Sequence, residues 1–477
     1  MNMSELLLLT PEIVLLVLVS VVLVLDTMTS ESNISLTYGL SQVVLVIVIF
    51  LIISMAPDST MIILHKHFVS DQIATVLKTA VCVIALIVFF YSHHYLKEHE
   101  ILKGEFFILG LFAVLGMMVM ISANSLLTVY LGLELLSLSL YAMVAMNKDS
   151  KLASEAAMKY FVLGALASGM LLYGISMLYG VTGVIDLQGI AAFTSAQDGV
   201  NLLLVFGLVF VIVGVAFKFG AVPFHMWVPD VYEGSPTAVT LFISSAPKIA
   251  AFAMAIRLLV DGMQPLLMDW QGMLMIMSVL SMAAGNIIAI SQSNIKRMLA
   301  YSTIAHVGFL FLGLLSGRAE GYAGSMFYVM VYALMSAGTF GMIILMGRKG
   351  FEADRLDDFK GLANRNSWFA FMMLILMFSM AGVPPFLGFW AKWFVIKEVV
   401  AMGHIWLAAA AVVFSVIGAY YYLRIVKLMY FDEPEHLKAL KASQSLRFIL
   451  SLNAFALLLL GFAPEFLMAV CIAAFPS

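Results

Sequence analysis

The chain has 477 residues, of which 63% are hydrophobic and 11% are charged. Soluble domains are about 45–50% apolar and about 25% charged, so this composition excludes a soluble globular protein and indicates an integral membrane protein. The formal net charge of -3 is too small to indicate a strongly acidic or basic partner, such as nucleic acid.

The first apolar run begins in MNMSELLLLTPEIVLL, and no Lys or Arg precedes it. Because a signal peptide carries a positively charged first region, we expect this run to be a retained membrane span. The two cysteines, Cys82 and Cys471, lie in apolar runs without neighbouring Cys or His residues. We therefore expect neither a disulfide framework nor a metal site.

Apolar runs of about 20 residues, long enough to cross a bilayer, alternate with polar or Gly/Pro-rich segments along the whole chain. We predict an all-α polytopic membrane protein with about fourteen transmembrane helices. The fourth and fifth spans are joined only by SANS at 122–125, and the segment from Lys392 to about Met402 is taken as a continuation of the twelfth span. The predicted spans are 6–25, 35–55, 73–93, 106–122, 124–146, 157–181, 201–222, 237–260, 272–291, 298–316, 323–346, 367–391, 405–430 and 447–473.

Basic residues gather in the loops that follow odd-numbered spans, such as Lys97, Lys148 and Arg297, and in the longest polar connection, 348–366. The loops after even-numbered spans carry few, among them Lys66. The positive-inside rule therefore places the exits of odd-numbered spans in the cytoplasm and both termini on the opposite side of the membrane.

Two of the predicted spans, the seventh and the twelfth, contain similar proline-bearing sequences, GAVPF at 220–224 and AGVPPF at 381–386. A proline cannot donate a backbone hydrogen bond, so it frees the carbonyl four residues before it. Two broken helices at corresponding positions indicate a transporter built from inverted repeats, although two ordinary proline kinks would explain so short a similarity equally well. The prolines are Pro223, Pro384 and Pro385, and the freed carbonyls belong to Phe219, Met380 and Ala381.

Ionisable side chains occur deep within several predicted spans. Glu134 lies about ten residues from either end of span five, which is ~15 Å and so close to the middle of the bilayer. An ammonium at that depth costs roughly 2.5–3.5 kcal/mol on insertion scales, so a retained one is a functional candidate. The other deep residues are Lys218, Lys248, His306 and Lys392.

The spacing of these residues repeats. The interval from Glu134 to His306 (306 − 134 = 172) is close to that from Lys218 to Lys392 (392 − 218 = 174). Arg424 is a candidate counterpart of Lys248 (424 − 248 = 176). Each repeat would thus place two or three ionisable groups at matched positions.

A neighbouring carboxylate keeps a buried lysine charged, and withdrawing the carboxylate makes that lysine a better proton donor. We therefore hypothesise that Glu134 controls Lys218, that Lys248 and His306 accept and pass the proton, and that Lys392 is the terminal donor. The alternative is that these groups snorkel to the interface or form static ion pairs. For His306 the sequence favours neither hypothesis over the other.

Weaker candidates lie near the span ends. Glu155 and Lys159 are four residues apart at the mouth of span six, and they fit an interfacial ion pair as well as a role in proton uptake. Asp230 and Glu233 follow span seven and are expected to be solvated. The chain contains no Cys cluster, Gly-rich phosphate loop or nucleophile elbow, so any redox chemistry is expected elsewhere.

Four segments closely resemble the antiporter-like membrane subunits of respiratory complex I. They are AFKFGAVPFHMWVPDVYEGSPT (216–237), SSAPKIAAFAMAIR (244–257), SQSNIKRMLAYSTIAHVGF (291–309) and AGVPPFLGFWAKW (381–393). Within this family the sequence is most similar to the subunit N type, because Lys392 stands where the subunit M type carries glutamate. The chain also ends after span fourteen, without the lateral helix that the subunit L type would add.

The resemblance implies a single membrane domain, 1–477, with N-terminal helices at 1–104, inverted five-helix repeats at 105–262 and 263–430, and a last helix at 431–477. It also implies that Glu134 and Lys218 are a coupling pair, that Lys248 is the connecting lysine beside His306, and that Lys392 is the terminal proton site.

The function implied by the resemblance is that of a proton-translocating membrane subunit of a NADH-quinone oxidoreductase in the bacterial inner membrane, with both termini in the periplasm. FMN, iron–sulfur clusters and quinone would be bound by other membrane and peripheral subunits, and this chain would bind no cofactor or metal. Two rival hypotheses are a subunit of a multisubunit cation/proton antiporter and a scaffold subunit without its own proton path.

Overall fold

The computed structural model describes residues 3–28, 34–197, 201–348, 350–434 and 443–475, and most of them are helical. Thirteen helical segments in these ranges are long and apolar enough to cross a membrane, by length and composition. The predicted twelfth span is instead divided into two helices of 15 residues, α17 (Ser367–Ala381) and α18 (Leu387–Ala401). The prediction of a helical membrane protein with about fourteen spans is therefore confirmed. The chain termini, whose side of the membrane we predicted, fall partly outside the described residues, as does Lys349 of the predicted 348–366 connection.

The N-terminal part holds five helices and a short antiparallel hairpin. In the hairpin, β1 (Met61–Ile63) pairs with β2 (Phe68–Ser70), with Ile62 opposite Val69. The all-α prediction did not include this hairpin, because three-residue strands leave no periodic signal in a sequence. The five helices are α1 (Met3–Leu8), α2 (Thr10–Met28), α3 (Ile34–Ser54), α4 (Gln72–Glu98) and α5 (Gly104–Ile121).

The middle of the chain is more interrupted than the sequence predicts. Span eight was expected to be continuous, but it breaks at Ser245, whose φ of -112° and ψ of -94° are not helical. Two short helices, α8 and α10, were not predicted, because each is far below the length of a span. The elements are α6 (Leu126–Val144), α7 (Lys151–Thr182), α8 (Leu187–Ser195), α9 (Leu202–Phe219), α10 (Trp227–Gly234), α11 (Thr237–Ser244), α12 (Ala246–Ala255) and a π-helix, η2 (Ile256–Gly262).

The C-terminal part repeats the pattern of long helices around one broken helix. A 3-10 turn, Gln264–Leu266, leads into it. The remaining elements are α13 (Leu267–Ile290), α14 (Ile295–Leu314), α15 (Ala319–Met346), a 3-10 turn at Leu356–Phe359, α16 (Leu362–Arg365), α17, α18, α19 (Ile405–Phe431), α20 (Gln444–Phe462) and α21 (Glu465–Ala474).

The two broken helices end in the same way. Gly220 follows α9 with φ +77° and Gly382 follows α17 with φ +82°, both left-handed. A glycine adopts this conformation without a Cβ clash, so it terminates the helix just before the proline that cannot continue it. The predicted breaks in helices seven and twelve are therefore confirmed.

Among the helix pairs that approach closely, α5–α6 and α13–α14 lie at matching places in the two predicted repeats. A Cβ at Gly116 of α5 would lie 2.6 Å from the Leu136 nitrogen of α6, and a Cβ at Gly285 of α13 would lie 2.6 Å from the Ala305 nitrogen of α14. Small residues let membrane helices pack backbone to backbone. The matched pairs fit two related five-helix units, while the exact boundaries at 104/105, 262/263 and 430/431 stay a prediction.

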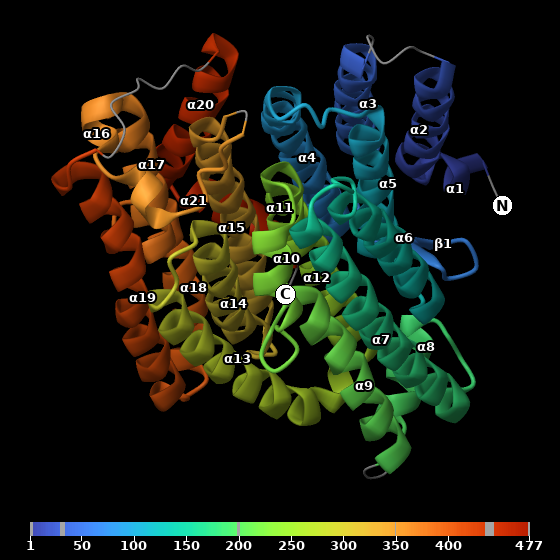
Figure 1. Ribbon diagram of the computed structural model, residues 1–477. Helices are drawn as coiled ribbons and strands as arrows, with labels where there is room; N and C mark the ends of the chain where they lie inside the picture. The colour runs from blue at the N-terminus through green and yellow to red at the C-terminus, as the bar shows by residue number, and fades with distance from the viewer. Residues whose placement is uncertain (1–2, 29–33, 198–200, 349, 435–442, 476–477) are drawn as a thin grey trace.

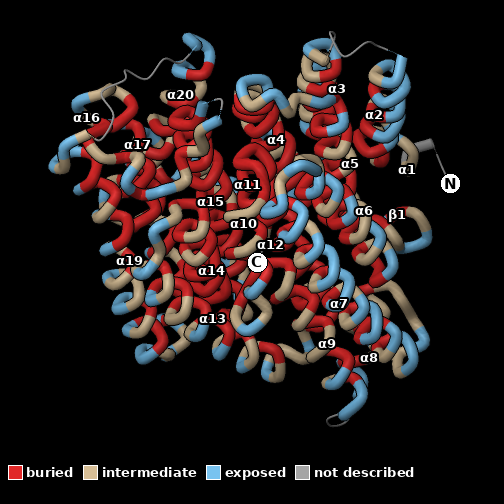
Figure 2. Tube along the Cα trace, viewed as in Figure 1, coloured by how far each residue is buried: buried red, intermediate tan, exposed pale blue. Residues whose placement is uncertain are grey.

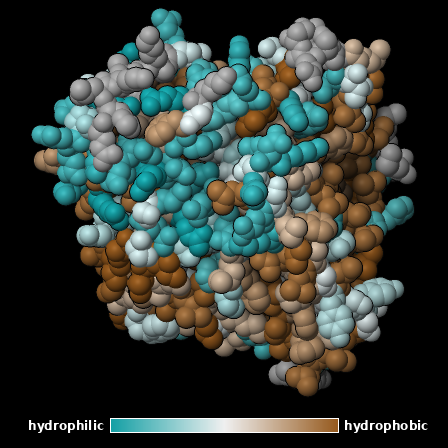
Figure 3. Space-filling view, in the orientation of Figure 1, coloured by the Kyte–Doolittle hydropathy of each residue, from teal (hydrophilic) through white to brown (hydrophobic). Residues whose placement is uncertain are grey.

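The helices form a broad body with its most buried members in the middle. Figure 1 shows α2 and α3 at one side, α17 and α19 at the other, and α11, α12, α14 and α15 between them. The apolar part of the span Thr237–Gly262 is 100% buried, whereas the apolar parts of α2 and α3 are only 28% and 33% buried. Figure 2 shows the same contrast in its colours for buried and exposed residues. On the face drawn in Figure 3, apolar residues cover the right flank and the lower part, and hydrophilic ones gather above and toward the centre. An apolar outer belt around a buried centre is what a bilayer requires.

Candidate functional site

Lys218 lies in the last turn of α9, 8% exposed, beside a small cavity between α6, α7 and α9. Its Nζ donates to the Ser137 hydroxyl at 3.0 Å. Ser168, which lines the same cavity, donates to the Glu134 carboxylate. Among the described residues no contact within 4.0 Å joins Glu134 to Lys218, so the two members of the expected coupling pair are not directly bonded, and each is hydrogen-bonded to a different serine.

Lys248 lies directly after the break at Ser245 and is 2% exposed. Its Nζ donates at 2.7 Å to the Phe219 carbonyl, which Pro223 has deprived of its helical donor. The ring of Trp227 lies 5.4 Å from the same Nζ, within cation–π range. The carbonyl freed by the break in helix seven thus accepts a hydrogen bond from a lysine of helix eight.

Lys392 likewise donates a hydrogen bond to a carbonyl that is freed by the second break. It is 8% exposed, and its Nζ donates at 2.9 Å to the Ala381 carbonyl, four residues before Pro385, and at 2.9 Å to the Ser415 hydroxyl. The Phe309 ring centroid lies 4.9 Å from the Nζ. By its contacts Lys392 therefore corresponds to Lys248, although the interval count paired it with Lys218.

His306 stands between the two breaks on α14 and is 5% exposed. Its Nδ1 is 2.7 Å from the Tyr328 hydroxyl and its Nε2 is 3.1 Å from the Tyr422 hydroxyl. A small cavity, with room for about one water molecule, is lined by Lys248, His306 and Tyr332. His306 therefore faces Lys248 on one side, and Phe309, one turn further along α14, faces Lys392.

The structure does not bring Arg424 into this row. Its Nη1 donates to the carbonyls of Ile290 and Gln292 at 3.3 Å each, at the end of α13. The sequence suggestion that Arg424 is the counterpart of Lys248 rested on spacing alone, and the contacts do not support it.

The two buried lysines at the breaks have no acidic partner. In the described part of the chain, no carboxylate lies within 4.0 Å of either Nζ, and both amines are held by backbone carbonyls and hydroxyls. A lysine held by a carboxylate strands a buried anion when it loses its proton, whereas a lysine held by a carbonyl does not. These two side chains are therefore suited to gain and lose protons in place.

The predicted uptake residues belong to a partly exposed ion-pair network that joins α7, α10 and α14. Lys159 Nζ lies 2.8 Å from both Glu155 and Asp230, and Arg297 lies 2.8 Å from Asp230 and 2.9 Å from Glu233. Burial alone would raise the pKa of Asp230, but hydrogen bonds from Lys159 and Arg297 hold that pKa below its usual value. The prediction that Asp230 and Glu233 are merely solvated is wrong, because they lie on the unpredicted helix α10 and face cations of α7 and α14.

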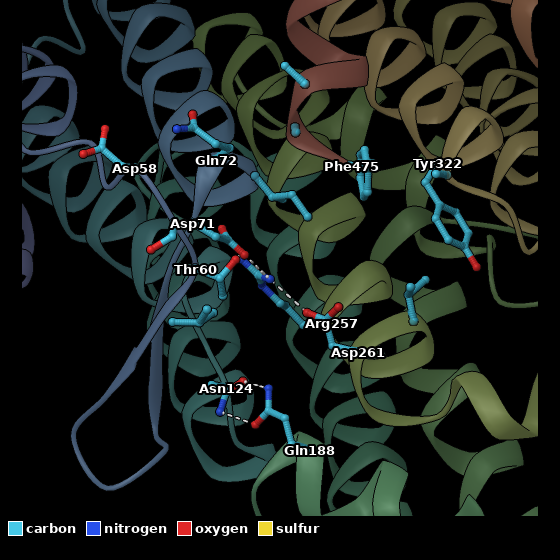
Figure 4. A pocket seen from close by; sticks show the side chains of 17 residues that line it. Asp58, Thr60, Asp71, Gln72, Asn124, Gln188, Arg257, Asp261, Tyr322 and Phe475 are labelled. Carbon is cyan, nitrogen blue, oxygen red and sulfur yellow. Dashed lines mark hydrogen bonds and ion pairs between the residues drawn. The ribbon is translucent and has the colours of Figure 1, made fainter. Parts of the chain in front are cut away.

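Two buried ion-pair clusters were not predicted. Arg257 of η2 is 2.8 Å from Asp71 and 2.9 Å from Asp261, and Figure 4 shows its guanidinium between the two carboxylates at the wall of a larger cavity. Glu12 of α2 forms a buried ion pair with Lys78 of α4. The signal for the second pair was present, since both residues interrupt apolar runs, while the Asp71–Arg257 contact joins positions 186 residues apart. Within the described ranges, no group of three or more His, Cys, Asp or Glu side chains is arranged to hold a metal ion.

Comparison with known proteins gives concordant matches. The family model described as NADH:quinone oxidoreductase/Mrp antiporter, TM, matches residues 123–418. A NADH-quinone oxidoreductase subunit N of Thioalkalivibrio sulfidiphilus is 55% identical over 461 residues, covering 96% of this chain and 96% of that protein. The same subunit of Thiobacillus denitrificans is 57% identical over 466 residues, covering 97% of this chain and 96% of the relative.

Solved structures share the fold. A chain of respiratory complex I from Thermus thermophilus superposes with a TM-score of 0.84 at 28% identity, covering 97% of this chain and 100% of the other. A chain of the Mrp complex from Dietzia superposes with a TM-score of 0.84 at 21% identity, covering 99% of this chain and 97% of the other, which is a likeness of fold alone.

Proposed function

The chain belongs to the subunit N group of NADH-quinone oxidoreductase, within the NADH:quinone oxidoreductase/Mrp antiporter family, and from that premise we propose that protons cross it along a row of buried amines and imidazole at mid-membrane depth. As such a subunit it is a proton-translocating membrane part of an enzyme complex that transfers electrons from NADH to quinone. The row consists of Glu134, Lys218, Lys248, His306 and Lys392.

One observation carries this proposal: the carbonyls freed by the two helix breaks each bind a buried lysine that has no acidic partner among the described residues. Lys248 holds the Phe219 carbonyl and Lys392 holds the Ala381 carbonyl. Each carbonyl dipole stabilises the ammonium. The carbonyl also keeps its hydrogen bond when the amine is neutral, because a neutral amine can still donate. Protonation can therefore change at both lysines without breaking the structure around them.

The order of the row follows from its contacts. Lys218 donates to Ser137, and Glu134 accepts from Ser168, which lines the same small cavity. A movement of the carboxylate would therefore change the charge near Lys218 and how strongly Lys218 holds its proton. Lys248 and His306 share the small cavity between the breaks, and His306 can accept at one ring nitrogen while donating at the other. Lys392 is the last amine of the row and would release the proton.

The surroundings of the subunit follow from the same family. An iron–sulfur cluster needs several thiolates, and the chain's two cysteines lie in separate apolar segments, so we place FMN, iron–sulfur clusters and quinone in partner subunits of the complex. The excess of basic residues in odd-numbered loops supports a bacterial inner-membrane orientation with both termini in the periplasm. The other membrane subunits of complex I are its proposed partners.

The test compares two lysines of one helix. Lys392→Ala removes the terminal amine, while Lys397→Ala removes an exposed lysine of α18 five residues further on. In inverted membrane vesicles, NADH-driven proton uptake per assembled complex should fall by about tenfold or more for the first variant and stay at the wild-type rate for the second. Wild-type proton uptake by a fully assembled Lys392→Ala complex would leave only the scaffold hypothesis.

A further inference from the structure

His306 is hydrogen-bonded at both ring nitrogens by tyrosine hydroxyls from two different helices. Its Nδ1 is 2.7 Å from the Tyr328 hydroxyl of α15, and its Nε2 is 3.1 Å from the Tyr422 hydroxyl of α19. Both tyrosines are only 1% exposed. A histidine that carries protons can use both nitrogens, so the two hydroxyls decide which proton arrangements the ring can adopt.

The hydroxyl at Nε2 has a second partner. Among the described residues that line the small cavity shared with Lys248 is Tyr328 but not Tyr422, and the Tyr422 hydroxyl is instead hydrogen-bonded to the Ser302 hydroxyl. Ser302 and His306 are four residues apart on α14, so they lie on the same side of that helix. Tyr422 therefore joins both residues from α19, at the ring nitrogen that Tyr328 does not contact.

The Nε2 site has to serve a ring that changes its protons. A neutral imidazole donates at one nitrogen and accepts at the other, whereas an imidazolium donates at both. The partner at Nε2 must therefore be able to donate in one state and accept in another. The Tyr422 hydroxyl can do either, and the Ser302 hydroxyl can take the opposite role toward it, so no hydrogen bond is lost when the direction reverses.

We propose that Tyr422 is a positioning residue that, together with Ser302, lets His306 gain and lose a proton without turning its ring. This rests on the proposed function of the row, in which His306 exchanges protons with its neighbours. Tyr422 and Ser302 keep their own protons throughout and only reverse the direction of their hydrogen bonds. The number of protons in this cluster therefore changes at the imidazole alone.

The neighbouring tyrosine supplies a matched control. Tyr421 is also 1% exposed and lies on the same helix, but its hydroxyl donates to the Asn286 Oδ1 at 3.1 Å. The ring centroids of Tyr421 and Tyr422 are 4.3 Å apart. Changing either tyrosine to phenylalanine thus removes one buried, hydrogen-bonded hydroxyl at the same level of α19, and of the two only Tyr422 is bonded to His306.

The test measures NADH-driven proton uptake per assembled complex in inverted membrane vesicles, in light and in heavy water. Tyr422→Phe leaves the imidazolium without its acceptor at Nε2, so proton uptake should fall by about tenfold. Because proton transfer at His306 then limits the rate, the ratio of the uptake rates in light and heavy water should rise above the wild-type ratio. Tyr421→Phe should keep both the wild-type rate and the wild-type ratio.

Ser302→Ala is the second variant, and it leaves the Tyr422 ring and hydroxyl in place. It removes the partner that allows the hydrogen bond at Nε2 to reverse, so proton uptake should fall by about threefold and the ratio should again rise. If Tyr422→Phe prevents assembly of the complex, Ser302→Ala decides the question. A wild-type rate and ratio in Ser302→Ala would overturn the proposal.

The outcomes separate this role from the function it rests on. A role of Tyr422 in packing alone would lower proton uptake without changing the ratio of rates in light and heavy water, and that result would also overturn the proposal. If Lys392→Ala lowers proton uptake while Tyr422→Phe and Ser302→Ala behave like Tyr421→Phe, the row stands and the role of Tyr422 falls. If Lys392→Ala leaves proton uptake unchanged, both proposals fall together.

Discussion

At the scale of single residues, the buried charges fall into two kinds. Arg257 is held by two carboxylates, Asp71 and Asp261, whereas Lys248 and Lys392 are held by carbonyls. Breaking a buried ion pair leaves an uncompensated charge and typically costs about 3–5 kcal/mol. The carboxylate-bound kind is therefore expected to support the fold, and the carbonyl-bound kind to change its protonation state.

The first prediction concerns acid stability. Burial alone would raise the pKa of Asp71, but the Arg257 charge and its hydrogen bonds hold that pKa below the usual value. Asp71 therefore stabilises the folded state fully above the ordinary aspartate pKa of about 3.9, and this contribution is lost as the pH falls through the lower folded value. In thermal unfolding of the purified complex, the Tm of the wild type should be higher than that of Asp71→Asn at pH 7. The difference between the two Tm values should shrink below about pH 4. An equal difference at both pH values would contradict this account of Asp71.

The deep residues themselves were predictable, because a charge inside an apolar run is visible in the sequence. The acceptors at the two breaks were also predictable from proline chemistry, which named Phe219 and Ala381. The pairing of each acceptor with its lysine was not, since it depends on how segments far apart in the chain fold together. This is why the interval count matched Lys392 to Lys218 when its contacts match those of Lys248.

At the scale of helices, interruption is what brings backbone polar groups to mid-membrane depth. A left-handed glycine follows each of α9 and α17, and helix eight is interrupted at Ser245, one turn before Lys248. Unsatisfied backbone groups are tolerated at this depth only where protein groups or water bind them. The breaks therefore account for why lysines are retained in the core.

The second prediction tests the geometry of the first break. A Cβ on Gly220 would lie 2.4 Å from Val228 Cγ2, and the φ of +77° disfavours any side chain. Gly220→Ala should therefore destabilise the subunit by about 1–3 kcal/mol and lower the amount of assembled complex. The control is Gly180→Ala in α7, where a Cβ would meet nothing within 4 Å. Equal amounts of assembled complex for the two variants would show that the left-handed turn is not required.

The interruption of helix eight could not be predicted from hydropathy, because the apolar run continues through it. SSAPK does contain a Pro at the position favoured at a helix start, and that local signal was outweighed by the length of the run. The short helices α8 and α10 and the hairpin were not predicted for a different reason. Each is too short to produce a periodic pattern of its own.

At the scale of the whole molecule, a buried centre of interrupted helices is enclosed by long apolar ones. The number of spans follows from hydropathy. The structure agrees with that number when the two shorter helices α17 and α18 are counted together as the twelfth span. The arrangement of the spans around the row does not follow from hydropathy, because it depends on contacts between distant segments. The N-terminal helix α2 lies at the side of the body and is joined to α4 by the buried Glu12–Lys78 pair.

The third prediction addresses this attachment with a double-mutant cycle. Lys78→Met and Glu12→Gln should each destabilise the solubilised complex by about 3–5 kcal/mol, because each strands a buried charge. The double variant should regain most of the loss, since a pair without charges has nothing left to compensate. Thermal unfolding measures all four species, and proton uptake per assembled complex should stay at the wild-type rate. Additive losses in the double variant would show that the two residues do not act as a pair.

The measurement that tests the central claim most directly is NADH-driven proton uptake by vesicles that carry the Lys248→Met complex. Lys248 is the buried amine at the first break and the middle amine of the row. Methionine fills a similar volume without a site for a proton. The account predicts that proton uptake per assembled complex falls by about tenfold or more. Proton uptake at the wild-type rate, with the complex fully assembled, would contradict a proton path through the middle of this subunit.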